Sequence, residues 1–168
     1  MTTLRAQTET KIRQLEARSL FGLWAMAVFL LVSSAVYYGL ERLFPLSPEI
    51  RSFLGPAPPL GLISLALVVY SFSAIVLILS RMTMGHPPGS GFAHVGYLTG
   101  FYIFYHLAGA SVENLWAVLA AGATILVLSG YHQRTFCAEA ISEERETLAR
   151  LELRERFSGV SEEERTKK

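Results

Sequence analysis

The chain has 168 residues, of which 51% are apolar and 17% are charged, with a formal net charge of +1. Soluble domains carry about 25% charged residues, so this composition favours a membrane protein. The nearly balanced charge provides no basic surface, and we expect no nucleic-acid partner. The single cysteine, Cys137, excludes an intramolecular disulfide and any multi-cysteine metal site.

Charged residues divide the middle of the chain into four long uncharged stretches. The first holds 22 residues between Arg18 and Glu41, and the second holds 29 between Arg51 and Arg81. The third holds 31 residues between Arg81 and Glu113, and the fourth holds 20 between Glu113 and Arg134. A transmembrane helix needs roughly 20 apolar residues, because each residue rises about 1.5 Å across a core about 30 Å thick. Hydrocarbon cannot satisfy backbone polar groups, so each crossing must be a helix. Prolines at 56, 58, 59, 87 and 88 delay the start of the second and third helices.

The sequence therefore predicts an all-α, integral membrane four-transmembrane-helix bundle with a helical cytoplasmic N-terminal arm and C-terminal tail. The expected parts are an N-terminal helix at 1–18, a four-span membrane domain at 19–133 and a charged helical tail at 134–168. The spans are expected at about 19–40, 60–80, 92–109 and 112–133. With four spans, 13 basic residues lie on the side of both termini against two on the other. The positive-inside rule makes that side cytoplasmic, and we expect a bacterial cytoplasmic (inner) membrane.

Three segments of this chain carry additional expectations. The apolar run after Arg18, which ends in small residues at 33–35, also resembles a cleavable signal peptide, although the run is longer than usual. The triplet Ser47-Pro48-Glu49 predicts a short helix to about Leu54 in the outer loop. The tail is expected to continue the last span as a helix to about Phe157, with frayed final residues. It docks either on the N-terminal arm or on a partner.

Polar side chains gather in the third and fourth spans. Thr99, Tyr102 and His106 share one face of the third span, and Glu113 and Asn114 follow at the start of the fourth. Ionisable groups inside a membrane are costly, which makes this seam a candidate path for a proton or a solute. The structural alternative for His106 is a neutral ring bonded to Tyr102, to a backbone carbonyl or to another helix. The structural alternative for Glu113 is stabilisation by the dipole of the fourth span.

Histidines offer a second hypothesis, a cofactor site. His94 and His132 lie near the cytoplasmic ends of adjacent spans, and together with His106 they are candidates for a b-type haem or a quinone. A histidine near the interface needs no cofactor, however, and we expect none. No metal site is expected either, because further ligands are not evident.

Small residues predict where helices pack closely. Gly96 and Gly100 form a GxxxG pair, and Gly109 lies in the link between the third and fourth spans. Ala117, Ala121 and Gly122 follow in the fourth span. We expect this set to pack within the hairpin of these two spans, with contact to another copy as the alternative. Tyr97, Phe101 and Tyr105 form a four-residue repeat that we expect to face lipid.

The sequence contains no motif for nucleophilic catalysis or phosphate binding. We therefore expect a non-enzymatic membrane protein, an accessory or structural subunit of a larger membrane complex. Its expected partners are the lipid bilayer and other membrane-protein subunits or further copies of itself. Two alternatives remain: a small oligomeric channel or carrier that uses the seam from Thr99 to Glu113, and a haem- or quinone-binding membrane anchor subunit.

Overall fold

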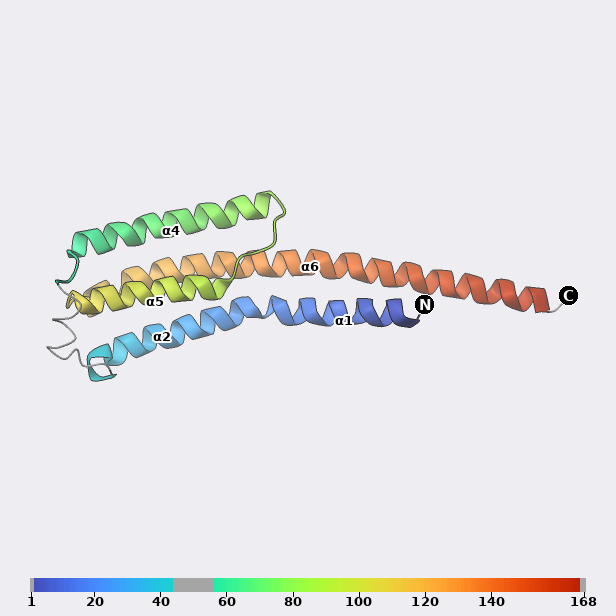
Figure 1. Cartoon of the computed structure of the whole chain (residues 1–168), viewed down its shortest axis with the longest axis horizontal. Helices are drawn as coiled ribbons and strands as arrows, with labels where there is room; N and C mark the ends of the chain where they lie inside the picture. Colours follow the sequence, from blue (N-terminus) through green and yellow to red (C-terminus); the bar gives the residue numbers. More distant parts are fainter. Residues whose placement is uncertain (1, 44–55, 167–168) are drawn as a thin grey trace. The chain divides into compact units, whose positions relative to one another are not determined.

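The computed structural model describes the backbone of residues 2–43 and 56–166 and the side chains of residues 5–39 and 56–153. The described residues form helices and no strand, which confirms the all-α fold class. The helices are α1 Thr2–Ser19, α2 Phe21–Leu43, α4 Leu60–Thr83, α5 Gly91–Leu107 and α6 Ser111–Thr166 (Figure 1). They belong to two compact units, residues 21–133 and residues 1–20 with 134–168. The helix expected at 47–54 lies outside the described residues.

Three of the described helical segments are long and apolar enough to cross a membrane. They are Arg5–Gly39, Leu60–Thr83 and Ser111–Leu153. Their outer surfaces carry large apolar side chains, and Leu31 on α2 and Phe72 on α4 are each 70% exposed. Apolar surface on this scale is characteristic of helices that contact lipid.

The helix α5 is shorter than expected, with 17 residues in place of the predicted 92–109. Gly109 ends it, because this residue has a φ of 71°. The N–H of Gly109 donates to the carbonyl of His106, and the N–H of Ala110 donates to the carbonyl of Tyr105, which is the Schellman arrangement. Gly109 was expected to pack against a helix, but a Cβ there would meet no atom within 4 Å, so its role is this turn.

The helix α4 ends in the same way at Gly85, with a φ of 67°. The N–H groups of Gly85 and His86 donate to the carbonyls of Met82 and Arg81. Glycine adopts this left-handed conformation without the penalty that a Cβ imposes. Local sequence therefore fixes where α4 and α5 end.

The helix α5 packs against both α2 and α4. It runs parallel to α2, because Phe92 contacts Phe21 and Tyr102 contacts Phe29 and Ser33. It runs antiparallel to α4, because Tyr105 contacts Ser64 and His94 contacts Tyr70. The helix α6 approaches α2 at two points, where Gly22 meets Gly130 and where Phe29 covers Gly122.

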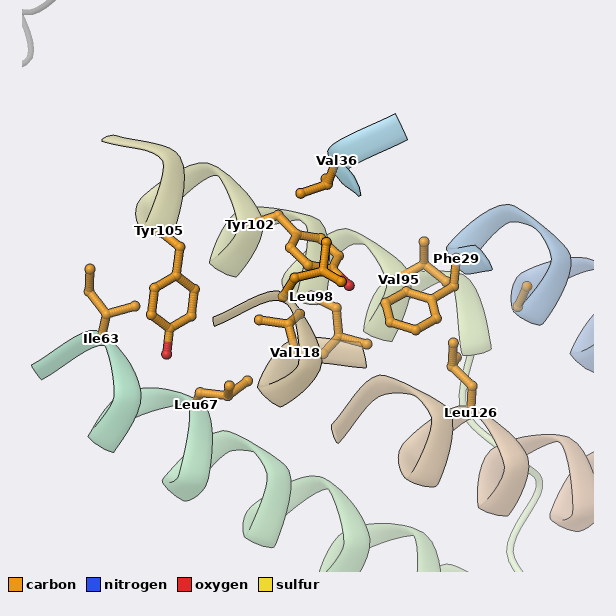
Figure 2. Close-up of a cluster of buried hydrophobic side chains, with 12 residues drawn as sticks. Phe29, Val36, Ile63, Leu67, Val95, Leu98, Tyr102, Tyr105, Val118 and Leu126 are labelled. Carbon is orange, nitrogen blue, oxygen red and sulfur yellow. The ribbon is translucent and has the colours of Figure 1, made fainter. Parts of the chain in front are cut away.

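A small apolar cluster of Ala74, Ile78 and Ile125 lies between α4 and α6, and a larger apolar core contains residues of all four helices. Figure 2 shows part of it, with Phe29 of α2, Leu98 and Tyr102 of α5 and Val118 of α6 close together. Leu98, Phe29 and Val118 are completely buried. This layer holds α5 in place, so the polar side chains on α5 have defined positions.

The helix α6 contains 56 residues and continues nine residues beyond the predicted end at Phe157. The helical backbone therefore includes most of the final residues that were expected to fray. The segment after Phe157 has a single glycine and no proline, and its glutamates favour helix.

The two ends of the chain form the second unit. The side chain of Arg5 bonds to Glu152 at 3.2 Å, that of Lys11 pairs with Glu144, and that of Arg145 lies 3.6 Å from Glu16. These pairs define an antiparallel arrangement of α1 and the tail of α6, which Figure 1 also shows. Thr8 and Cys137 are buried in this unit. Of the two alternatives for the tail, docking on the N-terminal arm is the one observed.

Apolar positions follow a seven-residue repeat along the tail of α6, and two apolar residues three positions apart face it from α1. Ile12 and Leu15 on α1 and Ile141, Leu148 and Leu151 on α6 are half-buried. Alternating steps of three and four residues are the pattern of a coiled-coil seam. Cys137 lies at the start of this seam, in the tail beyond the expected last span. Its burial raises the pKa of the thiol, and the nearby Arg18 partly offsets the rise.

Candidate functional site

Polar side chains of α5 connect it to two neighbouring helices. The hydroxyl of Tyr102 lies 2.9 Å from the hydroxyl of Ser33 on α2, and Ser33 also donates to the carbonyl of Phe29 at 2.9 Å. Because the serine hydroxyl has one proton, the tyrosine is the donor in the contact with Ser33 when both bonds exist together. Tyr102 therefore has a structural partner in the core.

The hydroxyl of Tyr105 makes the equivalent contact with α4, at 3.0 Å from the hydroxyl of Ser64. Figure 2 shows its ring extending from α5 toward Ile63 and Leu67. The expectation that Tyr105 faces lipid is wrong, since it is 1% exposed, whereas Tyr97 is 63% exposed. A four-residue step turns about 40° around a helix, so a repeat that begins on the lipid side enters the core two steps later.

A second aromatic group lies between α4 and α5, around Tyr70. Its hydroxyl lies 2.8 Å from Nδ1 of His94. The rings of Tyr97 and Phe101 lie with their centroids 5.6 and 5.8 Å from that of Tyr70. This bond fixes the orientation of the His94 ring, so the structure gives His94 a role without a cofactor.

His106 is the exception among these side chains. It is 7% exposed, and neither ring nitrogen has a hydrogen-bond partner among the residues that the structure describes. Leaving a buried polar group unpaired costs about 1–3 kcal/mol. The predicted bond from His106 to Tyr102 is absent, because the hydroxyl of Tyr102 faces Ser33.

The other residues of the predicted seam bond within their own helices or face outward. The hydroxyl of Thr99 donates to the carbonyl of Val95 at 2.8 Å, and the amide of Asn114 donates to the carbonyl of Ala110 at 3.0 Å. Glu113 is exposed in the first turn of α6. The five seam residues therefore lie in different environments, and only Tyr102 and His106 are in the core.

The histidines of the cofactor hypothesis also differ in their surroundings. His132 is buried and His94 is half-buried. Within the described part of the chain, no group of three or more His, Cys or Glu side chains could hold a metal ion. The arrangement supplies hydrogen bonds between helices rather than a set of ligands.

The glycines that pack closely are not those of the GxxxG pair. A Cβ at Gly96 or Gly100 would meet no atom within 4 Å in the described structure. The close approaches use Gly22, Gly122 and Gly130 in their place. Of the two alanines, Ala121 packs against the core and Ala117 is exposed. Gly122 belongs to the set expected from the sequence, but its partner is the ring of Phe29 on α2 and not the third span.

Comparisons of the chain with protein-family models, with curated proteins and with solved structures found no match.

Proposed function

We propose that the chain is an integral membrane protein with four spans and both termini in the cytoplasm. The ion pairs between α1 and the tail of α6 support this topology, because they require both segments to lie on the same side. A chain returns to its starting side only after an even number of crossings. Three helices suit a span by length and composition, and α5 then supplies the fourth crossing.

The packing of α5 supports its role as a span despite its length. At about 1.5 Å per residue its 17 residues extend for about 26 Å, which lies near the lower limit for a crossing. Phe92 lies beside Phe21, Tyr102 lies beside Ser33, and five further residues follow. The helix α5 thus covers nearly the same depth as α2 between Phe21 and Gly39.

Labelling from one side of the membrane tests this topology. In a Cys137→Ser background, an impermeant maleimide applied outside intact cells should label Ser111→Cys and should not label His86→Cys. His86 lies between α4 and α5, and Ser111 is the first residue of α6, so the two positions flank α5. Equal labelling of the two positions from one side would rule out a crossing by α5.

The function that the structure supports best is that of a subunit in a larger membrane assembly. One observation carries it: the two ends of the chain together build a water-facing helical pair with many charged side chains. Glu139, Glu143, Glu146 and Arg150 are exposed there, and none of them forms an ion pair with another described residue. Such a surface suits recognition of a protein partner by complementary charge.

Photo-crosslinking in the native membrane tests the subunit role. A photoreactive residue at Glu143 should give one protein adduct of defined mass, whereas the same residue at Leu65, on the apolar surface of α4, should give lipid adducts. Reversing the charges of Glu143 and Glu146 to lysine should remove the protein adduct. A chain that gives no adduct at Glu143 and elutes as a monomer from native membrane would refute the role.

The unpaired ring of His106 favours a second candidate function, that of a small carrier or channel. A buried imidazole without a partner can exchange a proton with a passing solute or water. Flux through proteoliposomes should then fall in His106→Ala and remain in Thr99→Val, because Thr99 bonds only to its own helix. Equal flux in wild type and His106→Ala would exclude this candidate.

A further inference from the structure

The unpaired ring of His106 lies near one end of the bundle. His106 is the last but one residue of α5, and it follows the first residue, Gly91, by 15 positions. At about 1.5 Å per residue, the two ends of α5 are therefore about 22 Å apart along the helix. The proposed topology places the end with His106 on the outer side of the membrane.

An apolar layer closes the core between His106 and the cytoplasmic end. Leu98 of α5, Phe29 of α2 and Val118 of α6 are each completely buried, and Figure 2 shows them close together. Leu98 precedes His106 by eight positions, which is about 12 Å along the helix. The hydroxyl of Tyr102, which lies between them along α5, is already bonded to α2. A proton therefore reaches His106 from the outer end of the bundle.

The helix α2 is interrupted at the level of His106. Gly39 has a φ of 115° and a ψ of 91°, so the helical backbone is broken there and resumes up to Leu43. Residues paired between α2 and α5 differ by about 70 positions, which places His106 level with about residue 36 of α2. Gly109, which is also left-handed, ends α5 directly after this level. Two glycine hinges thus flank the unpaired ring.

The titratable groups near this end do not offset a charge on His106. In the described parts of the helices they are Tyr37, Tyr38, Tyr102, Tyr105 and Glu113. The hydroxyls of the two buried tyrosines are bonded to α2 and α4, and the other three residues are exposed. The first ten residues of α4 contain no titratable side chain. A protonated His106 would therefore be a buried charge without an acceptor among the described residues, which is costly.

We infer that His106 is a proton-binding site whose charging opens the outer end of the bundle at acidic pH. An ordinary histidine gains its charge between about pH 8 and pH 5. The closed form excludes this proton and the open form accepts it, so the closed form loses stability as the pH falls. Rotation at Gly39 and Gly109 would bring the charged ring to water and to Glu113. The inference shares its ring with the carrier candidate but requires no flux, and it rests on the proposed topology only for the side from which acid acts.

Cysteine accessibility tests the opening in the purified full-length protein in lipid nanodiscs. Both faces of the membrane then have the same pH, so the result does not depend on the topology. In a Cys137→Ser background, Val36→Cys reports on the outer end and Val95→Cys on the inner half, since both positions are buried. Each rate of reaction with dithiodipyridine, which also reacts at acidic pH, is divided by that of the exposed Val112→Cys.

The expected response is confined to the outer position. Between about pH 8 and pH 5 the relative rate at Val36→Cys should rise, by up to about tenfold per pH unit for one linked proton. The relative rate at Val95→Cys should stay unchanged. No rise at Val36→Cys would overturn the inference, and so would an equal rise at both positions, because that result indicates unfolding of the whole bundle.

Histidine variants assign the response to His106. His106→Gln removes the titrating group and should abolish the rise at Val36→Cys. His94→Gln is the matched control, because it makes the same change on the same helix at a ring bonded to Tyr70, and it should keep the rise. Retention of α-helical circular dichroism identifies folded variants, and His106→Asn serves if His106→Gln fails to fold. A rise that persists in the folded variant of His106 would contradict the inference.

Discussion

Replacing Gly122 by alanine should destabilise the helical bundle by about 1–3 kcal/mol, the usual cost of overpacking a core. The added Cβ would overlap the Phe29 ring, with 2.6 Å to Cε1 and 2.8 Å to Cε2, whereas ordinary contact begins near 3.4 Å. The ring has no room to move away, because Phe29 is completely buried and stacks on Tyr102 with a centroid distance of 6.3 Å. The helix or the ring must therefore shift by several tenths of an ångström.

Unfolding by a strong detergent, followed by circular dichroism, measures this change. Gly96→Ala is the matched control, because its Cβ would meet no atom within 4 Å and alanine favours helix by about 0.5–1 kcal/mol. The double variant Gly122→Ala with Phe29→Leu should be more stable than Gly122→Ala alone, since the shorter side chain removes the overlap. Equal stability of Gly122→Ala and Gly96→Ala would refute the close packing of Phe29 of α2 on Gly122 of α6.

Three further predictions concern other contacts. Ser33→Ala and Tyr102→Phe should each lower the free energy of unfolding by about 0.6 kcal/mol, a value typical of hydrogen bonds between membrane helices. A double-mutant cycle in the same unfolding assay should show coupling between the two residues, and additive effects would exclude the bond. Gly85→Ala and Gly109→Ala should each cost about 1–2 kcal/mol because of their left-handed φ, and unchanged stability would contradict the turn geometry. Glu144→Gln weakens the ion pair of Glu144 with Lys11 and should speed maleimide labelling of Cys137 about two- to fivefold. High salt should have the same effect on the wild type, whereas Glu143→Gln should leave the labelling rate unchanged.

The sequence predicted the helices better than the contacts between them. Long uncharged stretches indicate the helices because length and apolarity are what a membrane-spanning helix requires. The helix α4 begins at Leu60, as the prolines before it indicate. The approach of Phe29 to Gly122 depends on the rotation of two helices about their axes, which no single stretch encodes. The same limit explains Tyr105, whose partner Ser64 lies 41 positions away.

The polar groups also differ in whether their bonds are local in the sequence or depend on the fold. Thr99 and Asn114 bond to carbonyls four residues earlier, a local preference that their own sequence could have indicated. His106 has no such bond, because neither of its ring nitrogens has a partner among the described residues although the side chain is buried. A buried imidazole without a partner is visible only in three dimensions.

The pairing of the two ends of the chain sets an order of assembly during synthesis. Lys11 and Glu144 are 133 positions apart, so α1 is complete long before its partner leaves the ribosome. During that interval its basic side chains and half-buried Ile12 and Leu15 have no tail to pair with. The closed helical pair thus becomes possible only after the first half of α6 has been made. A chain truncated before Glu144 keeps α1 unpaired and recognisable to chaperones and proteases.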